Sequence, residues 1–410
     1  MKLNKLEKAW ILYDVGNSAF TLLVTTIMPI YFNYLAESAG LTDVQYLAYW
    51  GYAASIATLI VALSGPVLGT MADYKGFKKP IFIGSLLLGV VACLALGLAT
   101  TWLLFLVIYI IAKVGYAASL VFYDAMLPDI TEPDRVDTVS SQGYAWGYIG
   151  SCIPFALSLV LVLGNEIIGI SMSVAMALSF ALVSLWWVGC TIPLLKQYRQ
   201  RHYIEHQPRP VAASFARLWQ TLKSARKEPG IFLFLLAFFF YIDGVYTIID
   251  MATAYGSALG LDSTGLLLAL LVTQIVAFPF AILFGRLSRK FKNSKLIVIC
   301  VTAYLGIALF AMFLQHQWQF WTLAVLVGMF QGGIQALSRS YFAKIVPAER
   351  AGEYFGLMDI CGKGAAFFGT TLVSVVSQAT GSMNIGVGAI ASLFVIGLLV
   401  FRKAAALNRE

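Results

Sequence analysis

Two long apolar segments of the chain are joined by the stretch Gly69-Thr70-Met71-Ala72-Asp73-Tyr74-Lys75-Gly76-Phe77-Lys78-Lys79. The segments on either side, 44–72 and 80–99, contain no charged residue. A helix needs roughly 20 apolar residues to cross the ~30 Å hydrocarbon core of a bilayer. The stretch therefore predicts two membrane-spanning helices joined by a short basic loop.

The composition of the 410-residue chain extends this interpretation to its whole length. Hydrophobic residues make up 60% and charged residues 12% of the sequence, and the mean hydropathy is +0.82. Soluble domains are about 45–50% apolar and about 25% charged, so a soluble globular protein is excluded. Local turn chemistry alone places the breaks at 99–101, 315–317 and 380–384. Twelve membrane segments are predicted: 9–36, 44–72, 80–99, 102–126, 138–163, 167–195, 230–257, 263–287, 295–314, 318–345, 352–379 and 385–401.

The 28 Lys and Arg residues fix the predicted orientation. All but Lys113 and Lys363 fall in the termini and in alternate loops on the same side of the membrane, and the opposite loops have none. Short cytoplasmic loops retain positive charge, so both termini are predicted to be cytoplasmic. The net charge of +8 then reflects membrane topology, and no nucleic-acid partner is expected. The first segment is too long for a signal peptide and contains Asp14, so we expect it to remain as the first helix of a multi-pass cell-membrane protein.

One long polar interruption, 196–229, divides the chain into predicted bundles at 1–195 and 230–410. Residues 213–227 of this basic linker place apolar side chains at helical spacing among basic ones. The pattern is typical of a helix at the headgroup boundary, and a solvated tether explains it equally well.

An internal repeat supports the division into two halves. Gly285-Arg286-Leu287-Ser288-Arg289-Lys290-Phe291-Lys292 repeats the loop that contains Asp73. Pro133-Asp134-Arg135 matches Pro347-Ala348-Glu349-Arg350 at nearly the same separation. Duplicated six-helix bundles can rock about a site at the membrane midplane.

The pattern Gly69-x-x-x-Asp73-x-x-Gly76-x-Lys78-Lys79 resembles the loop motif of the major facilitator superfamily. Four further stretches resemble the vacuole effluxer family: Tyr13-Asp14-Val15-Gly16-Asn17-Ser18-Ala19-Phe20, Phe122-Tyr123-Asp124-Ala125-Met126-Leu127-Pro128-Asp129, Tyr241-Ile242-Asp243-Gly244-Val245 and Gln331-Gly332-Gly333-Ile334-Gln335-Ala336-Leu337-Ser338-Arg339-Ser340. The resemblance implies an all-α membrane protein with the major facilitator fold, in which twelve transmembrane helices form two pseudo-symmetric six-helix bundles. It also implies a secondary transporter. The yeast namesake of the family is an autophagy-linked vacuolar amino-acid effluxer.

The chain departs from superfamily patterns at three places. Arg289 occupies the position of Asp73 in the second loop. The fourth predicted segment, 102–126, carries Lys113 where many proton-coupled members have Arg. The fifth predicted segment, 138–163, lacks the Gly-Pro pair associated with antiporters.

Ionisable residues inside the predicted segments are the first candidates for a functional site: Asp14, Lys113, Asp124, Asp243, Asp250, Asp359 and Lys363. A charge at the bilayer centre costs about 2.5–3.5 kcal/mol, so such residues face a cavity or a partner. Asp359 and Lys363 are four residues apart and can pair on one helix face. Lys113 and Asp243 are predicted at similar depth in opposite halves, either as a pair that breaks during transport or as a permanent packing pair.

Polar uncharged residues complete the candidate site. Asn17 extends the polar stripe of Asp14, and Gln331 and Gln335 share a helix face that we expect in the substrate cavity. Arg339, nearer the cytoplasmic end, is interpreted as a gate or a loop anchor. The family resemblance further implies a gate built on Gly69, Asp73, Gly76, Lys78 and Lys79, in which Asp73 lies near a helix N-terminus of the opposite half.

No enzyme is predicted, because the chain lacks a GxSxG, HExxH, Walker or GxGxxG motif in a suitable context. No metal or cofactor is expected, and the histidines are interpreted as solvated loop and linker residues. Without an ATP site, transport must use a gradient of protons or another ion. We expect a monomeric transporter of a small solute, most simply an amino acid, in the lipid bilayer. Export of organic cations or drugs and lipid flipping or scrambling remain the alternatives.

Overall fold

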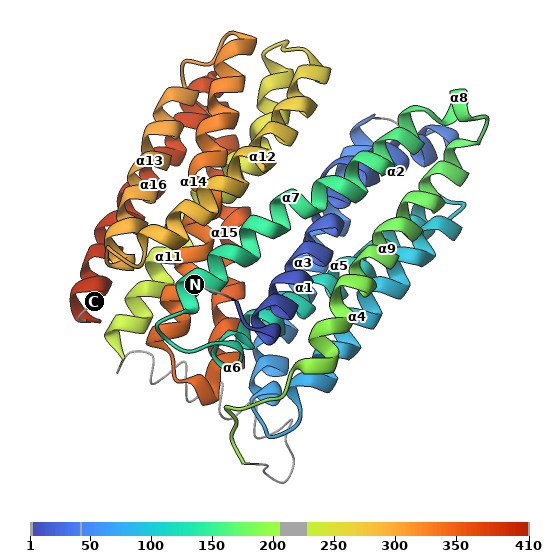
Figure 1. The fold of residues 1–410 in the computed structure, drawn as a ribbon. Coiled ribbons are helices and arrows are strands. Elements are labelled where there is room, and N and C mark those ends of the chain that lie inside the picture. Colours follow the sequence, from blue (N-terminus) through green and yellow to red (C-terminus); the bar gives the residue numbers. More distant parts are fainter. Residues whose placement is uncertain (1–2, 42, 206–227, 409–410) are drawn as a thin grey trace.

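The computed structural model describes residues 3–41, 43–205 and 228–408, and these residues fold almost entirely into helices (Figure 1). The helices of the N-terminal half are α1 (Lys5–Leu22), which continues through a π-helical turn (Leu23–Ile27) into α2 (Met28–Ser38), α3 (Asp43–Ala72), α4 (Lys78–Ala95), α5 (Trp102–Ala125), α6 (Leu127–Ile130), α7 (Val136–Leu163), α8 (Asn165–Ile168) and α9 (Met172–Gln197). Those of the C-terminal half are α11 (Pro229–Ala258), α12 (Ser263–Leu287), α13 (Asn293–Ala311), α14 (Gln317–Ile345), α15 (Ala351–Thr380) and α16 (Met383–Leu407).

Eleven helices in the described part of the chain, with α1 and α2 counted as one, are long and apolar enough to cross a membrane. The 30-residue α15 is a further long helix, in agreement with the twelve predicted segments. The breaks inferred from turn chemistry occur where predicted, since α5 begins at Trp102, α14 at Gln317 and α16 at Met383. The predicted amphipathic segment 213–227 lies outside the described residues.

Short polar side chains fix the starts of several helices. At α1, the Asn4 side chain accepts the Glu7 N–H, and the Glu7 carboxylate accepts the Asn4 N–H. This reciprocal capping satisfies two backbone donors that the helix leaves unpaired. Single side-chain acceptors cap four later helices: Thr101 at α5, Ser171 at α9, Asp262 at α12 and Ser382 at α16.

The two halves meet where α3 packs against α15 and where α7 packs against α12 and α14. Figure 1 shows the bundles converging at the end that carries α6 and the described chain ends, and spreading apart toward the end that carries α8. We call the first of these the basic end, because it carries the Lys- and Arg-rich loops. Gly69 allows the close approach of α3 and α15, since a Cβ there would lie 2.3 Å from the Gly352 carbonyl oxygen.

Candidate functional site

Arg339 of α14 is the central charged residue of the interface between the halves. Its side chain is buried, and its guanidinium reaches into the N-terminal half. There it donates to the Asp124 carboxylate at 3.0 Å, to the Ser140 hydroxyl at 2.9 Å and to the Ser140 carbonyl at 2.9 Å. The Asp14 carboxylate lies 3.6 Å away. One cation of the C-terminal half is therefore held by two acids and a serine of the other half.

Aromatic rings enclose the same guanidinium. Its central carbon lies 4.2 Å from the ring centroid of Tyr144 and 4.7 Å from that of Trp10. Arg stacks on aromatic faces because its planar charge is weakly hydrated. Gly143 leaves room for this arrangement, since a Cβ there would lie 2.9 Å from Asp14 Oδ2 and 3.1 Å from the guanidinium. These rings help to bury the guanidinium, and the Arg339 side chain is only 4% exposed.

A second junction joins α3 to the N-terminal turn of α15. The buried Asp73 carboxylate accepts the backbone N–H groups of Gly352 at 2.7 Å and Glu353 at 3.0 Å. A carboxylate at this position satisfies two unpaired donors and lies at the positive end of the helix dipole. Lys78, whose ammonium is fully buried, lies 3.9 Å from Asp73 and 3.6 Å from Asp129.

Two other predicted gate residues, Gly76 and Lys79, lie in or next to the loop between α3 and α4. Gly76 adopts a φ of 79°, in the left-handed region that favours glycine. Lys79 lies in the first turn of α4 and is partly exposed.

A third junction lies at the start of α7. The Asp137 carboxylate accepts from the Lys344 ammonium at 2.6 Å and from the Asn293 amide at 2.6 Å, and both donors belong to the C-terminal half. All three junctions lie at the basic end. Ser140, Asp137 and Asn293 could not be predicted at these junctions, because their partners lie far away in the sequence.

The first residues of the linker form a strap against the α3–α4 loop. The Ile204 N–H donates to the Asp73 carbonyl at 2.8 Å, and the Lys75 N–H donates to the Ile204 carbonyl at 3.0 Å. The Lys75 ammonium bonds to Tyr203 and lies near Glu205, and these interactions raise its pKa. His202 is a linker residue whose side chain is 38% exposed, and its ring nitrogen lies 2.9 Å from the buried Asp129 carboxylate. His206 lies outside the described residues.

The predicted glutamines lie one to two turns farther from the basic end than Arg339. Gln335 accepts a hydrogen bond from the Tyr148 hydroxyl of α7 at 3.2 Å, and Gln331 is buried beside the same tyrosine. Asn17 donates to Asp14 at 3.4 Å. These amides therefore line the interface next to the Arg339 cluster, on the side away from the basic end.

Lys113 and Asp243 do not pair in this conformation among the described residues. Lys113 lies over the Tyr109 ring at 5.7 Å and near Asp250 of the opposite half. The Oδ1 atom of Asp243 accepts from the Gly369 N–H at 2.9 Å and from the Thr247 hydroxyl at 3.3 Å. Asp243 points to α15 within its own bundle, so it does not face Lys113.

Asp243 is buried, and its Oδ2 atom has no hydrogen-bond partner. Gly369 makes this position possible, since a Cβ there would lie 2.4 Å from Asp243 Oδ1. Asp359 faces α3, where its Oδ2 lies 4.0 Å from the position of a Cβ on Gly65. The side chain of Lys363, the predicted partner of Asp359, lies outside the described residues.

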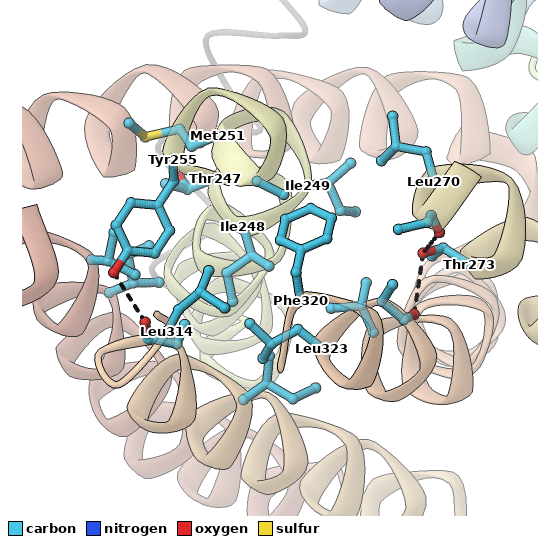
Figure 2. A pocket seen from close by; sticks show the side chains of 18 residues that line it. Thr247, Ile248, Ile249, Met251, Tyr255, Leu270, Thr273, Leu314, Phe320 and Leu323 are labelled. Atoms are coloured by element: carbon cyan, nitrogen blue, oxygen red, sulfur yellow. Dashed lines mark hydrogen bonds between the residues drawn. The ribbon is translucent and has the colours of Figure 1, made fainter. Parts of the chain in front are cut away.

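A cavity of ≈ 80 Å³ lies inside the C-terminal bundle (Figure 2). Its walls are apolar, and its polar groups are already paired: Tyr255 donates to the Ala311 carbonyl at 3.1 Å, and Thr273 donates to the Ala324 carbonyl at 3.1 Å. Thr247 at its edge is bonded to Asp243. A polar solute would find no unpaired hydrogen-bonding group among these wall residues.

The intramembrane charge balance differs from the sequence estimate at one residue. Arg339 is counted above with the Lys and Arg residues of the cytoplasmic side, although the predicted segment 318–345 contains it; it lies inside α14 and is only 3% exposed. Its burial is tolerated because Asp14 and Asp124 compensate its charge.

Comparisons with known proteins agree with this architecture. Residues 39–408 match the family model described as "Vacuole effluxer Atg22 like". The chain is 45% identical over 404 residues to the MFS-type transporter YxiO of Bacillus subtilis, a match that covers 97% of this chain and 94% of YxiO. It is 27% identical over 293 residues to Autophagy-related protein 22-2 of Aspergillus niger, covering 63% of this chain and 49% of that protein.

The fold is similar to that of solved transporters. FucP, the E. coli fucose:proton symporter, was solved in an outward conformation and matches with a TM-score of 0.71 at 15% identity, covering 98% of this chain and 97% of FucP. The relatives and the fold are those of transporters and not of enzymes. With its family-model match and its extensive identity to YxiO, the chain belongs to the Atg22-like vacuole effluxer family of the major facilitator superfamily.

Proposed function

We propose that the protein is a secondary transporter that moves amino acids across the cell membrane by alternating access, with the basic end in the cytoplasm. The observation that carries this proposal is the Arg339 cluster, because one buried cation of the C-terminal half depends on Asp14, Asp124 and Ser140 of the other half. Such a contact forms only while the bundles touch at the basic end. Its rupture would accompany opening toward the cytoplasm.

The Asp73 junction supports the same gate. Its carboxylate caps a helix of the opposite half, so rocking of the bundles must break two charge-assisted hydrogen bonds. The Asp137 junction adds a third contact that must break in the same motion. The proposed state is therefore closed at the cytoplasm and accessible from the other side, as in the outward conformation of FucP.

The charges farther from the gate suit a zwitterionic substrate. Lys113 of α5 and Asp250 of α11 belong to opposite halves and lie close enough to interact electrostatically. In the proposed mechanism, Lys113 binds the substrate carboxylate, Asp250 binds its ammonium, and Gln331 and Gln335 hydrogen-bond to the remainder. The chain belongs to the vacuole effluxer family. The yeast namesake of this family is an amino-acid effluxer, which supports amino acids as the solute.

Asp243 is the proposed proton site. An ionised carboxylate buried without a cation is costly, so the neutral form is favoured in the state described here. A rearrangement within the C-terminal bundle that separates α11 from α15 during transport would hydrate the carboxyl group and release its proton. This route would couple solute movement to a proton gradient.

Thermal unfolding of the purified protein across a panel of amino acids, organic cations and lipid headgroups tests the substrate assignment. A ligand at 100 times its Kd stabilises the folded state by about 2.7 kcal/mol. Amino acids are expected to raise the unfolding temperature of the wild type, and Lys113→Gln and Asp250→Asn are expected to abolish the shift. Stabilisation by organic cations or lipid headgroups alone would refute the amino-acid assignment.

A further inference from the structure

A basic groove straddles the two halves beside the gate. It has a volume of ≈ 720 Å³ and is lined by Lys8 of α1, Thr138, Gln142 and Trp146 of α7, and Arg286 and Arg289 at the end of α12. The groove therefore takes residues from both bundles. It lies where α7 and α12 pack against each other.

The charge of this groove is unbalanced. Lys8, Arg286 and Arg289 are all exposed, and no acid contributes to its lining. The acids closest in sequence to the groove residues are paired elsewhere, Glu7 with Arg135 and Asp137 with Lys344. In the described part of the chain, none of the three cations forms an ion pair with a carboxylate. Three uncompensated cations in one concave surface attract an anion.

Arg289 is also the residue that breaks the internal repeat. In the first half, the corresponding Asp73 caps α15. In the second half, the Arg289 side chain reaches the first turn of α7 and donates to the Thr138 hydroxyl at 3.4 Å. At the junction of α3 with α15, the acid Asp73 caps a helix. At the repeat-related junction of α12 with α7, Arg289 instead presents a group that attracts anions.

Apolar side chains continue from the groove toward the membrane interior. On α12, Ile282, Phe278 and Ile275 follow Arg286 and Arg289 at helical spacing, and Ile275 is 48% exposed. On α7, Trp146 is 44% exposed and packs on Phe278 with ring centroids 5.3 Å apart. Ile153 continues the same face of α7 and is also exposed. A small soluble anion would not use these surfaces, whereas the acyl chains of a lipid would.

We propose that this groove binds an anionic phospholipid whose phosphate contacts Lys8, Arg286 and Arg289 and whose acyl chains run along α7 and α12. Arg recognises phosphate through paired N–H donors. The bound headgroup bridges the halves and favours the state that is closed at the basic end, because a ligand stabilises the state that it binds best.

Retention of phosphatidylglycerol by the purified protein tests the site, with native mass spectrometry and thermal unfolding as readouts. The test variant is Arg286→Gln/Arg289→Gln. The matched control is Lys290→Gln/Lys292→Gln, which removes two exposed cations from the same loop that do not line the groove. The apparent Kd for phosphatidylglycerol is expected to rise about 30-fold in the test variant and to stay near the wild-type value in the control. Phosphatidylcholine is expected to bind weakly to all three proteins.

Equal retention of phosphatidylglycerol by the test variant and the control would overturn the proposal. Stabilisation by inorganic phosphate to the same extent as by phosphatidylglycerol would also overturn it, because a free anion would then be the ligand. If the double variant does not fold, Lys8→Gln provides the test with a smaller expected loss. Each outcome is independent of the transported solute.

Discussion

Replacing Arg339 by Gln tests the proposed gate most sharply. The substitution leaves the buried Asp14 and the partly buried Asp124 without their cation and removes three hydrogen bonds to the other half. Breaking a buried ion pair by removing one partner costs about 3–5 kcal/mol. Because these contacts cross the interface, the cost falls on the closed state. The ratio of open to closed molecules should therefore rise by about 10²- to 10⁴-fold, since 1.36 kcal/mol corresponds to a factor of ten.

Electron–electron resonance distances between spin labels at Glu132 and Glu349 measure this shift. Both residues are exposed at the basic end, one in each half. The wild type should give mainly the short distance, and Arg339→Gln should add a longer one. Arg135→Gln is the matched control, because it breaks the buried pair of Arg135 with Glu7 inside one bundle. It should lower the unfolding temperature without changing the distance. An unchanged distribution in Arg339→Gln would refute the gate.

Three further predictions follow from the same contacts. Asp73→Ala removes the cap on α15, so it should lengthen the distance between spin labels at Glu132 and Glu349. Asp73→Asn keeps a hydrogen-bond acceptor and should lengthen the same distance less. Gly69→Ala should favour the open state, because the added Cβ would lie 2.3 Å from the Gly352 carbonyl oxygen, and equal distances in wild type and variant would contradict this. Asp243→Asn should fold and bind solute while losing the dependence of solute flux on a pH gradient in proteoliposomes; retained dependence would exclude Asp243 as the proton site.

The membrane architecture was predictable because hydrophobic length and Lys and Arg placement are local properties of the sequence. The helix breaks before Trp102, Gln317 and Met383 were found from turn residues alone. The resemblance to the loop motif implied that Asp73 lies near a helix N-terminus of the other half, and in the structure it contacts the first turn of α15. Local signals therefore identified the helices and one side of the interface.

Partners across the interface were not predictable in the same way. The depth of Arg339 depends on Asp14 and Asp124, which lie more than 200 residues away in sequence. The spacing of Asp243 and Asp250 identifies a face of α11 but not the helix that this face meets. In this conformation Asp243 contacts Gly369 of α15, and Lys113 lies near Asp250 instead. Asp129 ends one of the stretches that resemble the family, but its partner His202 lies beyond α9, more than 70 residues later in the sequence. Such pairings arise only from tertiary packing.

Amino-acid flux into proteoliposomes is the decisive measurement for a transporter gated at the Arg339 cluster. Wild-type protein is expected to accumulate amino acids under an imposed pH gradient and to lose accumulation when a protonophore collapses the gradient. Lys113→Gln and Arg339→Gln should each reduce this flux, the first by losing the substrate carboxylate contact and the second by losing the closed gate. Failure of the wild type to move any amino acid, or equal flux in wild type and Arg339→Gln, would contradict this mechanism.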